Sequence, residues 1–166
     1  MKKLSLIVLL FVFVFGKFAI NAQDAKFQAL IIYNFTKLLD WPDKSGDFVI
    51  EVVGNAELAK ELSDFTKTRR VAGMQNIIVN KVLPAEVSNA QIVVVGIADS
   101  DKLENIIANA GDRNTLIVTE KSGLTKKGAG ISLKKEKGVW QFQYDEQNIK
   151  KYGLKISADF RELGVE

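Results

Sequence analysis

The sequence predicts a single three-layer α/β/α domain with a mixed sheet and a C-terminal β-hairpin plus helix. Two observations lead to this prediction. Apolar, β-branched runs alternate with amphipathic helical segments through the middle of the chain, which is the element order of α/β proteins. Near the end, residues 131–133 and 139–144 flank Lys135-Glu136-Lys137-Gly138, and alternation around a short Gly-containing turn is typical of a β-hairpin. No repeat or linker divides the chain, so one domain is expected.

The first expected element is an amphipathic helix over residues 24–41, which Pro42 ends because the residue before proline avoids the helical conformation. Apolar residues recur in this segment at three- and four-residue steps, the spacing that lines one helix face. The residues predicted to face inward are Phe27, Leu30, Ile31, Phe35 and Leu38.

The remaining elements follow from apolar runs and turn residues. The first half has a strand over 48–53, a helix capped by Asn55, a short strand over 77–79 and a strand over 91–95. A helix from Asp99 or Ser100, a strand over 115–119 and a polar loop over 121–128 follow. The hairpin comes next, and then helical structure from Asp145 that is interrupted near Gly153. Gly54-Asn55 and residues 96–99 follow two strands of this set. Ligands in open α/β sheets bind beyond the carboxyl ends of strands, so we expect a pocket there.

Residues 1–22 have the composition of a secretory signal peptide. Lys2 and Lys3 precede an apolar run over residues 4–15, and small residues follow at Gly16, Ala19 and Ala22. A run of this length is shorter than the ~20 residues that a membrane-spanning helix needs. We therefore expect cleavage after Ala22, a mature domain over 23–166 and a periplasmic location, with an uncleaved membrane anchor as the alternative.

The charge and the missing residue types exclude several function classes. The three lysines of residues 1–22 have no acidic counterpart, so the net charge falls from +3 to zero when this segment is removed. A neutral domain is a poor nucleic-acid binder. The chain has no Cys and no His, which excludes Ser-His-Asp and Cys-His catalysis and thiolate or imidazole metal sites. We expect a protein that is not an enzyme and has no cofactor and no metal; a carboxylate-dependent hydrolase is the enzymatic alternative.

Several stretches of the mature chain match one known family. The most specific are residues 33–42, which read Tyr-Asn-Phe-Thr-Lys-Leu-Leu-Asp-Trp-Pro, and residues 153–157, which read Gly-Leu-Lys-Ile-Ser. The other matching stretches are residues 52–54, 71–73, 116–119 and 128–131. With these motifs the chain resembles the YfiR-like family of small exported bacterial proteins.

The resemblance implies a periplasmic regulator that binds a membrane-bound signalling partner. The best-known members restrain an inner-membrane diguanylate cyclase and so link the envelope to cyclic-di-GMP signalling, and other members resemble sensory partners of histidine kinases. Family members are often dimers, so the resemblance also implies a homodimer. Some members use cysteine pairs as a redox switch, which this chain cannot do because it has no cysteine. The alternative function is a periplasmic small-ligand-binding module without a signalling partner.

Four residues near the mature N-terminus are candidates for partner or ligand binding. Tyr33, Lys37 and Trp41 are spaced by four and would share one stripe of a helix, with Asn34 beside them. Tyr and Trp suit interfaces because each buries a large area and keeps a polar group. The alternative is structural: Trp41 would close the edge of the domain and Asn34 would bond a neighbouring loop.

Arg69 and Arg70, with Lys67, are candidates for a small anionic ligand, because guanidinium groups make paired contacts with phosphate or carboxylate. The alternative is a solvated loop. Residues 128–130 (Gly-Ala-Gly) are expected to form a turn rather than a phosphate loop. Asp99, Asp101 and Glu104 are expected to stabilise a helix start rather than to bind a cation.

Overall fold

The computed structural model describes residues 23–111 and 114–165, and the predicted signal peptide lies outside these residues. A helix covers residues 23–38 and is called the N-terminal helix below. The strands are β1 (Leu39–Asp40), β2 (Phe48–Val53), β3 (Arg70–Val71), β4 (Gln75–Val82), β5 (Ile92–Val95), β6 (Leu116–Thr119), β7 (Ile131–Glu136), β8 (Val139–Tyr144) and β9 (Lys155–Ile156). The other helices are α2 (Ala56–Thr66), α3 (Leu103–Ala110), α4 (Glu146–Lys151) and α5 (Ala158–Leu163), with 3-10 turns η1 (Pro84–Glu86), η2 (Ile97–Lys102) and η3 (Leu124–Lys127).

Seven strands form one mixed sheet in the order β3-β4-β2-β5-β6-β7-β8. The five inner strands run parallel, and the edge strands β3 and β8 run antiparallel to their neighbours. Every residue of β5 and β6 is buried, as expected for strands covered on both faces. This arrangement confirms the predicted single α/β domain with a mixed sheet.

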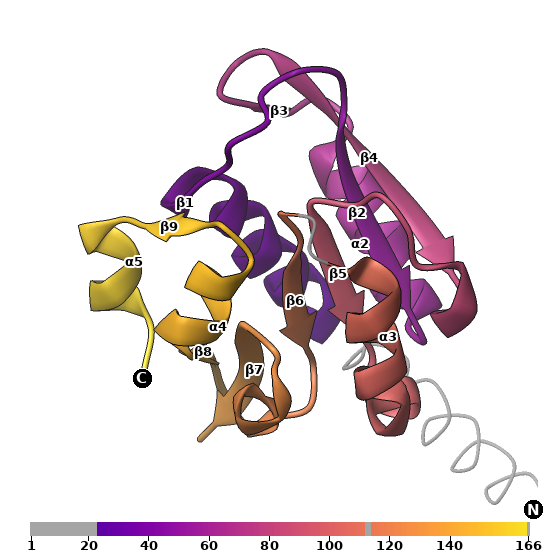
Figure 1. Cartoon of the computed structure of the whole chain (residues 1–166), viewed down its shortest axis with the longest axis vertical. Coiled ribbons are helices and arrows are strands. Elements are labelled where there is room, and N and C mark those ends of the chain that lie inside the picture. The colour runs from indigo at the N-terminus through magenta and orange to yellow at the C-terminus, as the bar shows by residue number, and fades with distance from the viewer. Residues whose placement is uncertain (1–22, 112–113, 166) are drawn as a thin grey trace, which may run out of the picture.

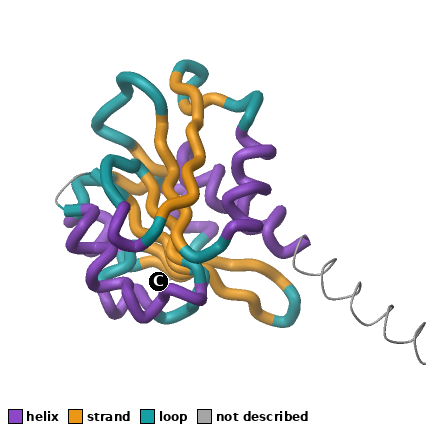
Figure 2. Tube along the Cα trace, turned by 90° about the vertical axis from the view of Figure 1, so that its right-hand side faces the viewer, coloured by secondary structure: helices purple, strands orange, loops and turns teal. Residues whose placement is uncertain are grey.

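The helices cover both faces of the sheet (Figures 1 and 2). The path from β2 through α2 to β4 moves along the sheet in one direction, and the path from β5 through α3 to β6 moves in the other. Because such crossovers are right-handed, α2 and α3 lie on opposite faces. The N-terminal helix lies on the α2 face, where Tyr33 packs edge-on against Phe65 with the ring centroids 5.6 Å apart.

The predicted hairpin is confirmed. β7 and β8 pair from Ile131 opposite Tyr144 to Glu136 opposite Val139. The two turn residues, Lys137 and Gly138, both have positive φ, of 49° and 83°, as a two-residue turn between twisted strands requires.

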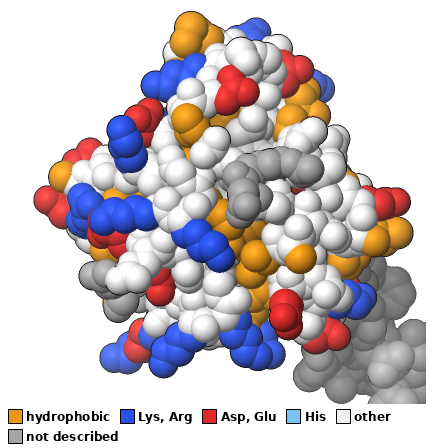
Figure 3. All heavy atoms as spheres, viewed as in Figure 1, with side chains coloured by type: hydrophobic (Ala, Val, Ile, Leu, Met, Phe, Trp, Pro, Cys, Tyr) orange, Lys and Arg blue, Asp and Glu red, His pale blue; other side chains and the backbone are white. Residues whose placement is uncertain are grey.

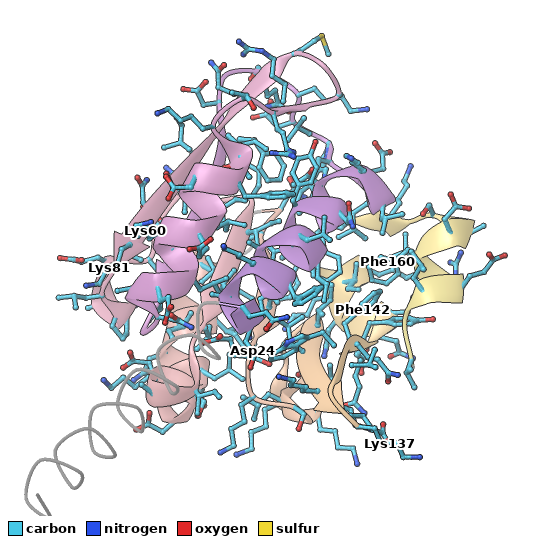
Figure 4. The ribbon with its side chains drawn as sticks, turned by 180° about the vertical axis from the view of Figure 1, so that it is seen from behind. Asp24, Lys60, Lys81, Lys137, Phe142 and Phe160 are labelled. Carbon is cyan, nitrogen blue, oxygen red and sulfur yellow. The ribbon has the colours of Figure 1, made fainter. Side chains whose placement is uncertain are left out.

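An aromatic cluster fastens the C-terminal helix to the domain. The ring of Phe160 on α5 lies 5.1 Å from the rings of both Phe142 and Tyr144, and Phe35 of the N-terminal helix packs 5.1 Å from Phe142. Figure 4 shows Phe142 and Phe160 pointing toward one another from β8 and α5. These rings join the first, the last and the hairpin elements into one core.

The predicted end of the N-terminal helix was wrong. The helix ends at residue 38, and Leu39–Asp40 form β1, which pairs antiparallel with β9 (Lys155–Ile156). The physical reason is this pairing, which takes the chain out of the helix before Pro42. A local pattern cannot reveal a partner more than a hundred residues away.

The predicted inward face of the N-terminal helix was partly wrong. Phe27 is 48% exposed and Leu30 is 42% exposed, whereas Phe35 is buried as predicted. The side chains at Ala25 and Ala29 are buried instead. Small residues on the packed face let the helix approach the sheet closely, which turns Phe27 and Leu30 outward.

Three other expected boundaries differ. The strand expected at 77–79 is longer and forms all of β4, because its polar residues Asn80 and Lys81 also pair with β2. The helix expected from Asp99 or Ser100 begins at Leu103, after the 3-10 turn η2. The C-terminal helical region is divided into α4, β9 and α5.

On the face shown in Figure 3, acidic and basic side chains are interspersed. Within residues 23–111 and 114–165, no helix has the length and apolar character needed to span a bilayer.

Candidate functional site

A cavity of about 510 Å³ opens beyond the carboxyl ends of the central parallel strands, where the sequence predicts a pocket. Strands β2, β5 and β6 all end at this edge because they run parallel. The chain leaves β2 toward one face and β5 toward the other, so the cavity lies at the point where the connections diverge. We call it the edge cavity; its lining residues are Asp24, Ala25, Gln28, Gly54, Asn55, Glu57, Ile97, Ala98, Glu120 and Trp140.

Two glycines bring the ends of β2 and β5 together beneath the edge cavity. A Cβ atom on Gly96 would lie 2.9 Å from the backbone carbon of Gly54 and 2.9 Å from the carbonyl oxygen of Val53. Gly54 has a φ of 75°, in the left-handed region that glycine adopts most readily. A larger residue at position 96 would therefore meet backbone atoms, whereas a Cβ atom on Gly54 would lie 2.5 Å from the side-chain Oδ2 of Asp99.

Asn55 and Glu120 form a fixed polar pair in the wall of the edge cavity. Asn55 Oδ1 accepts a hydrogen bond from the Leu58 amide at 2.9 Å, which caps α2 as the sequence predicts. Asn55 Nδ2 donates to Glu120 Oε1 at 2.8 Å. Both ends of the Asn55 amide are therefore used, and the buried Glu120 carboxylate is held with its other oxygen unbonded by any described residue.

Asp24 links the N-terminal helix to the hairpin at the opposite side of the edge cavity. Its Oδ1 accepts hydrogen bonds from Lys135 Nζ at 2.5 Å and from Trp140 Nε1 at 3.1 Å. The Lys135 hydrogen bond is the main cause of a lowered pKa for the Asp24 carboxyl, and the Trp140 hydrogen bond adds to it. Figure 4 shows Asp24 at the start of the helix, beside the strands of the hairpin.

Gln28 also has unused hydrogen-bonding capacity in the edge cavity. It follows Asp24 by four residues, so both side chains lie on one helix face. Its side chain is only 5% exposed, and no residue in the described ranges hydrogen-bonds its amide. Neither Gln28, Asp24 nor Trp140 was predicted from sequence; the only available signal was the i, i+4 spacing of two polar residues among apolar ones.

The structure brings together Tyr33, Lys37 and Arg69, which the sequence placed in two separate groups. Lys37 Nζ lies 4.4 Å from the centroid of the buried Tyr33 ring. Arg69 Cζ lies 3.8 Å from the Phe65 centroid and 5.7 Å from the Tyr33 centroid. Both cations are exposed while their neighbouring rings are packed in the domain. We call these four residues the basic–aromatic cluster.

Trp41 does not belong to that cluster. It follows β1 rather than continuing the helix, so the expected stripe stops at Lys37. Its ring is 3% exposed and packs edge-on against Phe48 at 4.9 Å, which agrees with the structural alternative. Its buried Nε1 has no hydrogen-bond partner among the described residues. Its side chain borders a second cavity, of about 330 Å³, beside the amino ends of β5 and β6.

The remaining candidate residues lie apart. Asn34 is half-buried on the N-terminal helix. Arg70 donates to Asn76 Oδ1 on β4, and Asn76 Nδ2 donates to Asp47 Oδ1 at 3.0 Å. Arg69 faces rings and Arg70 faces this polar group, so the two guanidinium groups do not converge on one anion.

The acidic residues at the start of α3 form no metal-binding group. Asp99 Oδ1 pairs with Lys102 Nζ at 2.7 Å. In the part of the chain that the structure describes, no three acidic side chains lie close enough to hold a metal ion. Residues 128–130 form a turn after η3, with Gly128 at a φ of 100°.

Comparison with protein-family models gives a match over almost the whole described chain. The matching family is described as DUF4154, YfiR/HmsC-like, and it covers residues 25–165. The match includes the N-terminal helix from residue 25 onward, all seven strands of the main sheet and α5. A comparison with curated proteins gave no match.

Proposed function

Because this chain belongs to the YfiR/HmsC-like family, we propose that it is an exported periplasmic protein that regulates a membrane-bound signalling partner by binding it. The partner would be a diguanylate cyclase or a sensor histidine kinase, and the protein would perform no catalysis itself. The observation that carries this proposal is the family match over residues 25–165, since members of this family are known as regulators of signalling.

The outer face of the N-terminal helix is the docking surface that we propose. Phe27, Leu30, Asn34 and Lys37 follow one another at steps of three, four and three residues, so they share one face. Two large apolar side chains one turn apart, both more than two-fifths exposed, are unusual on a charged helix surface. Figure 4 views the molecule from the side on which this helix lies.

The basic–aromatic cluster extends this surface. Lys37 and Arg69 lie over the rings of Tyr33 and Phe65, which restrains the two cations in an exposed position. Restrained side chains lose less entropy on binding. The surface therefore suits a partner that offers an apolar groove next to acidic side chains.

Regulation would follow from a difference in affinity for two states of the partner. A protein that binds one state of a sensor better shifts the population toward that state. Because the chain has no cysteine, its response cannot depend on forming a disulfide.

The test is binding of the mature protein to the periplasmic domain of a membrane cyclase or kinase from the same cell. Wild-type protein should bind, and Leu30→Asp should weaken binding by about tenfold or more because an apolar anchor is replaced by a charge. Leu163→Asp is the matched control, since Leu163 is also exposed but lies on α5. The proposal fails if no such domain binds, or if both variants bind as wild type does.

A second function has its own support in the edge cavity. A small-ligand-binding module without a signalling partner would need such a cavity and would not need the exposed helix face. Ligand binding without any membrane partner, and unchanged signalling after deletion of the gene, would favour this second function.

A further inference from the structure

We propose that the edge cavity binds a small organic molecule that carries a protonated amino group. This inference concerns the chemistry of one site and does not depend on which partner the protein regulates. It rests on the charge of the cavity wall, on the unpaired amide of Gln28 and on the size and lining of the cavity.

The wall of the edge cavity is acidic. Asp24, Glu57 and Glu120 line it, and no Lys or Arg is among its described lining residues. Lys135 neutralises Asp24 from outside the lining, through Oδ1. Glu120 is buried, and among the described residues its side chain bonds only to the neutral amide of Asn55 and forms no ion pair. An uncompensated buried carboxylate favours a cation next to it.

The unused amide of Gln28 is the second, independent observation. The side chain is buried, lines the cavity and has no hydrogen-bond partner among the described residues. An amide can both donate and accept, so it would pair with a hydroxyl, amide or amino group of the same ligand. A bare metal ion would not satisfy the donor half of this group, and the acidic side chains are not gathered as metal ligands.

The remaining wall suits an organic ligand. Trp140 supplies an aromatic surface, and Ile97 and Ala98 supply aliphatic surface. A cavity of about 510 Å³ has the size of small-molecule sites in proteins. A protonated amine can bind carboxylates and an aromatic face together.

The polar groups of the cavity are held before a ligand arrives. Asn55 is fixed by its cap hydrogen bond and positions Glu120, while Asp24 is fixed by Lys135 and Trp140. Because these groups lose little freedom on binding, a small ligand can bind without reorganising the site.

The test compares amines with neutral molecules of the same shape, using thermal unfolding and calorimetry of the mature protein. One pair is 1,5-diaminopentane and 1,5-pentanediol, and the other is glucosamine and glucose; the two pairs separate an aliphatic amine from an amino sugar. We expect at least one amine to stabilise the protein and its neutral counterpart to have no effect, since only a molecule that binds the folded state raises the melting temperature.

Two variants assign binding to this cavity. Glu120→Gln keeps an acceptor for Asn55 and removes the charge, so it should weaken amine binding by about tenfold or more. Gln28→Leu should weaken it by a smaller factor. Glu104→Gln, the same change on the exposed surface of α3, should leave it unchanged. The inference is overturned if neither amine binds better than its neutral counterpart, or if Glu120→Gln binds the amine as wild type does.

Discussion

Asn55 Nδ2 donates to Glu120 Oε1 at 2.8 Å, and this hydrogen bond connects the N-cap residue of α2 to the residue that follows β6, across 65 residues of sequence. The same asparagine caps α2 through its other amide atom. One residue therefore ends a loop, starts a helix and orients an acid of the edge cavity. Four predictions test this and other contacts.

Asn55→Asp should destabilise the protein although Asp caps helices as well as Asn does. The substitution removes the Nδ2 donor and places a second carboxylate beside Glu120, so we expect a loss of about 1–3 kcal/mol in the free energy of unfolding near neutral pH. Denaturant unfolding measures it. The double variant Asn55→Asp/Glu120→Gln should recover most of the loss; no recovery would contradict an interaction between these two side chains.

Gly96→Ala should destabilise the protein by about 2–4 kcal/mol, because its Cβ would meet backbone atoms that cannot move aside. Gly73→Ala is the control for backbone conformation. Gly73 has a φ of 74° and open space around its Cβ position, so only the left-handed penalty of about 1 kcal/mol applies. Similar losses for both variants, measured by chemical unfolding, would argue against close packing of β2 and β5.

Phe160→Ala should cost about 3–5 kcal/mol, because it removes a buried ring from the aromatic cluster. The exposed Leu163 lies on the same helix, and Leu163→Ala should change stability by no more than about 0.5 kcal/mol. Thermal and denaturant unfolding compare the two variants. Equal losses of unfolding free energy in the two variants would mean that α5 does not unfold cooperatively with the rest of the domain.

The ion pairs of Glu146 make the free energy of unfolding depend on pH. Arg161 donates to both of its carboxylate oxygens, at 2.8 and 3.2 Å, and Lys150 Nζ lies 2.9 Å away. The Arg161 hydrogen bonds, followed by the Lys150 hydrogen bond, lower the pKa of Glu146 from 4.5 to about 2. A carboxyl with a lowered pKa stabilises the folded state when ionised. Its contribution is complete above pH 4.5 and is lost as the pH falls toward 2.

Glu146→Gln should therefore be less stable than wild type above pH 4.5, and the difference should shrink as the pH falls. Unfolding by denaturant at a series of pH values measures it. Glu162→Gln, at an exposed position of α5, serves as the control. A difference that stays constant over this range would rule out ion pairing as its cause.

Local sequence patterns were sufficient to predict most strands of the sheet. The runs over 48–53 and 91–95 became β2 and β5, with β5 beginning one residue later than predicted, and the Lys137-Gly138 turn formed the hairpin. These features depend on side-chain periodicity and turn conformation within a few residues. The edge cavity could also be placed, because the ends of parallel strands meet at one edge.

The lining of that cavity could not be predicted. Asp24 meets Trp140 across 116 residues, and Gln28 reads as an ordinary surface residue in an amphipathic helix. For the same reason, the sequence pattern placed Phe27 and Leu30 inside. Which helix face is buried depends on the shape of the surface it packs against, not only on the periodicity of the helix.

By itself, the amino-acid sequence determined the α/β class, the order of most elements, the absence of thiol and imidazole chemistry, and the family resemblance, because these depend on composition and local pattern. Only the tertiary structure decided the end of the N-terminal helix, the exposure of Phe27 and Leu30, the burial of Trp41 and the contents of the edge cavity. Each of these depends on contacts between segments far apart in the chain, which form only when the whole domain packs.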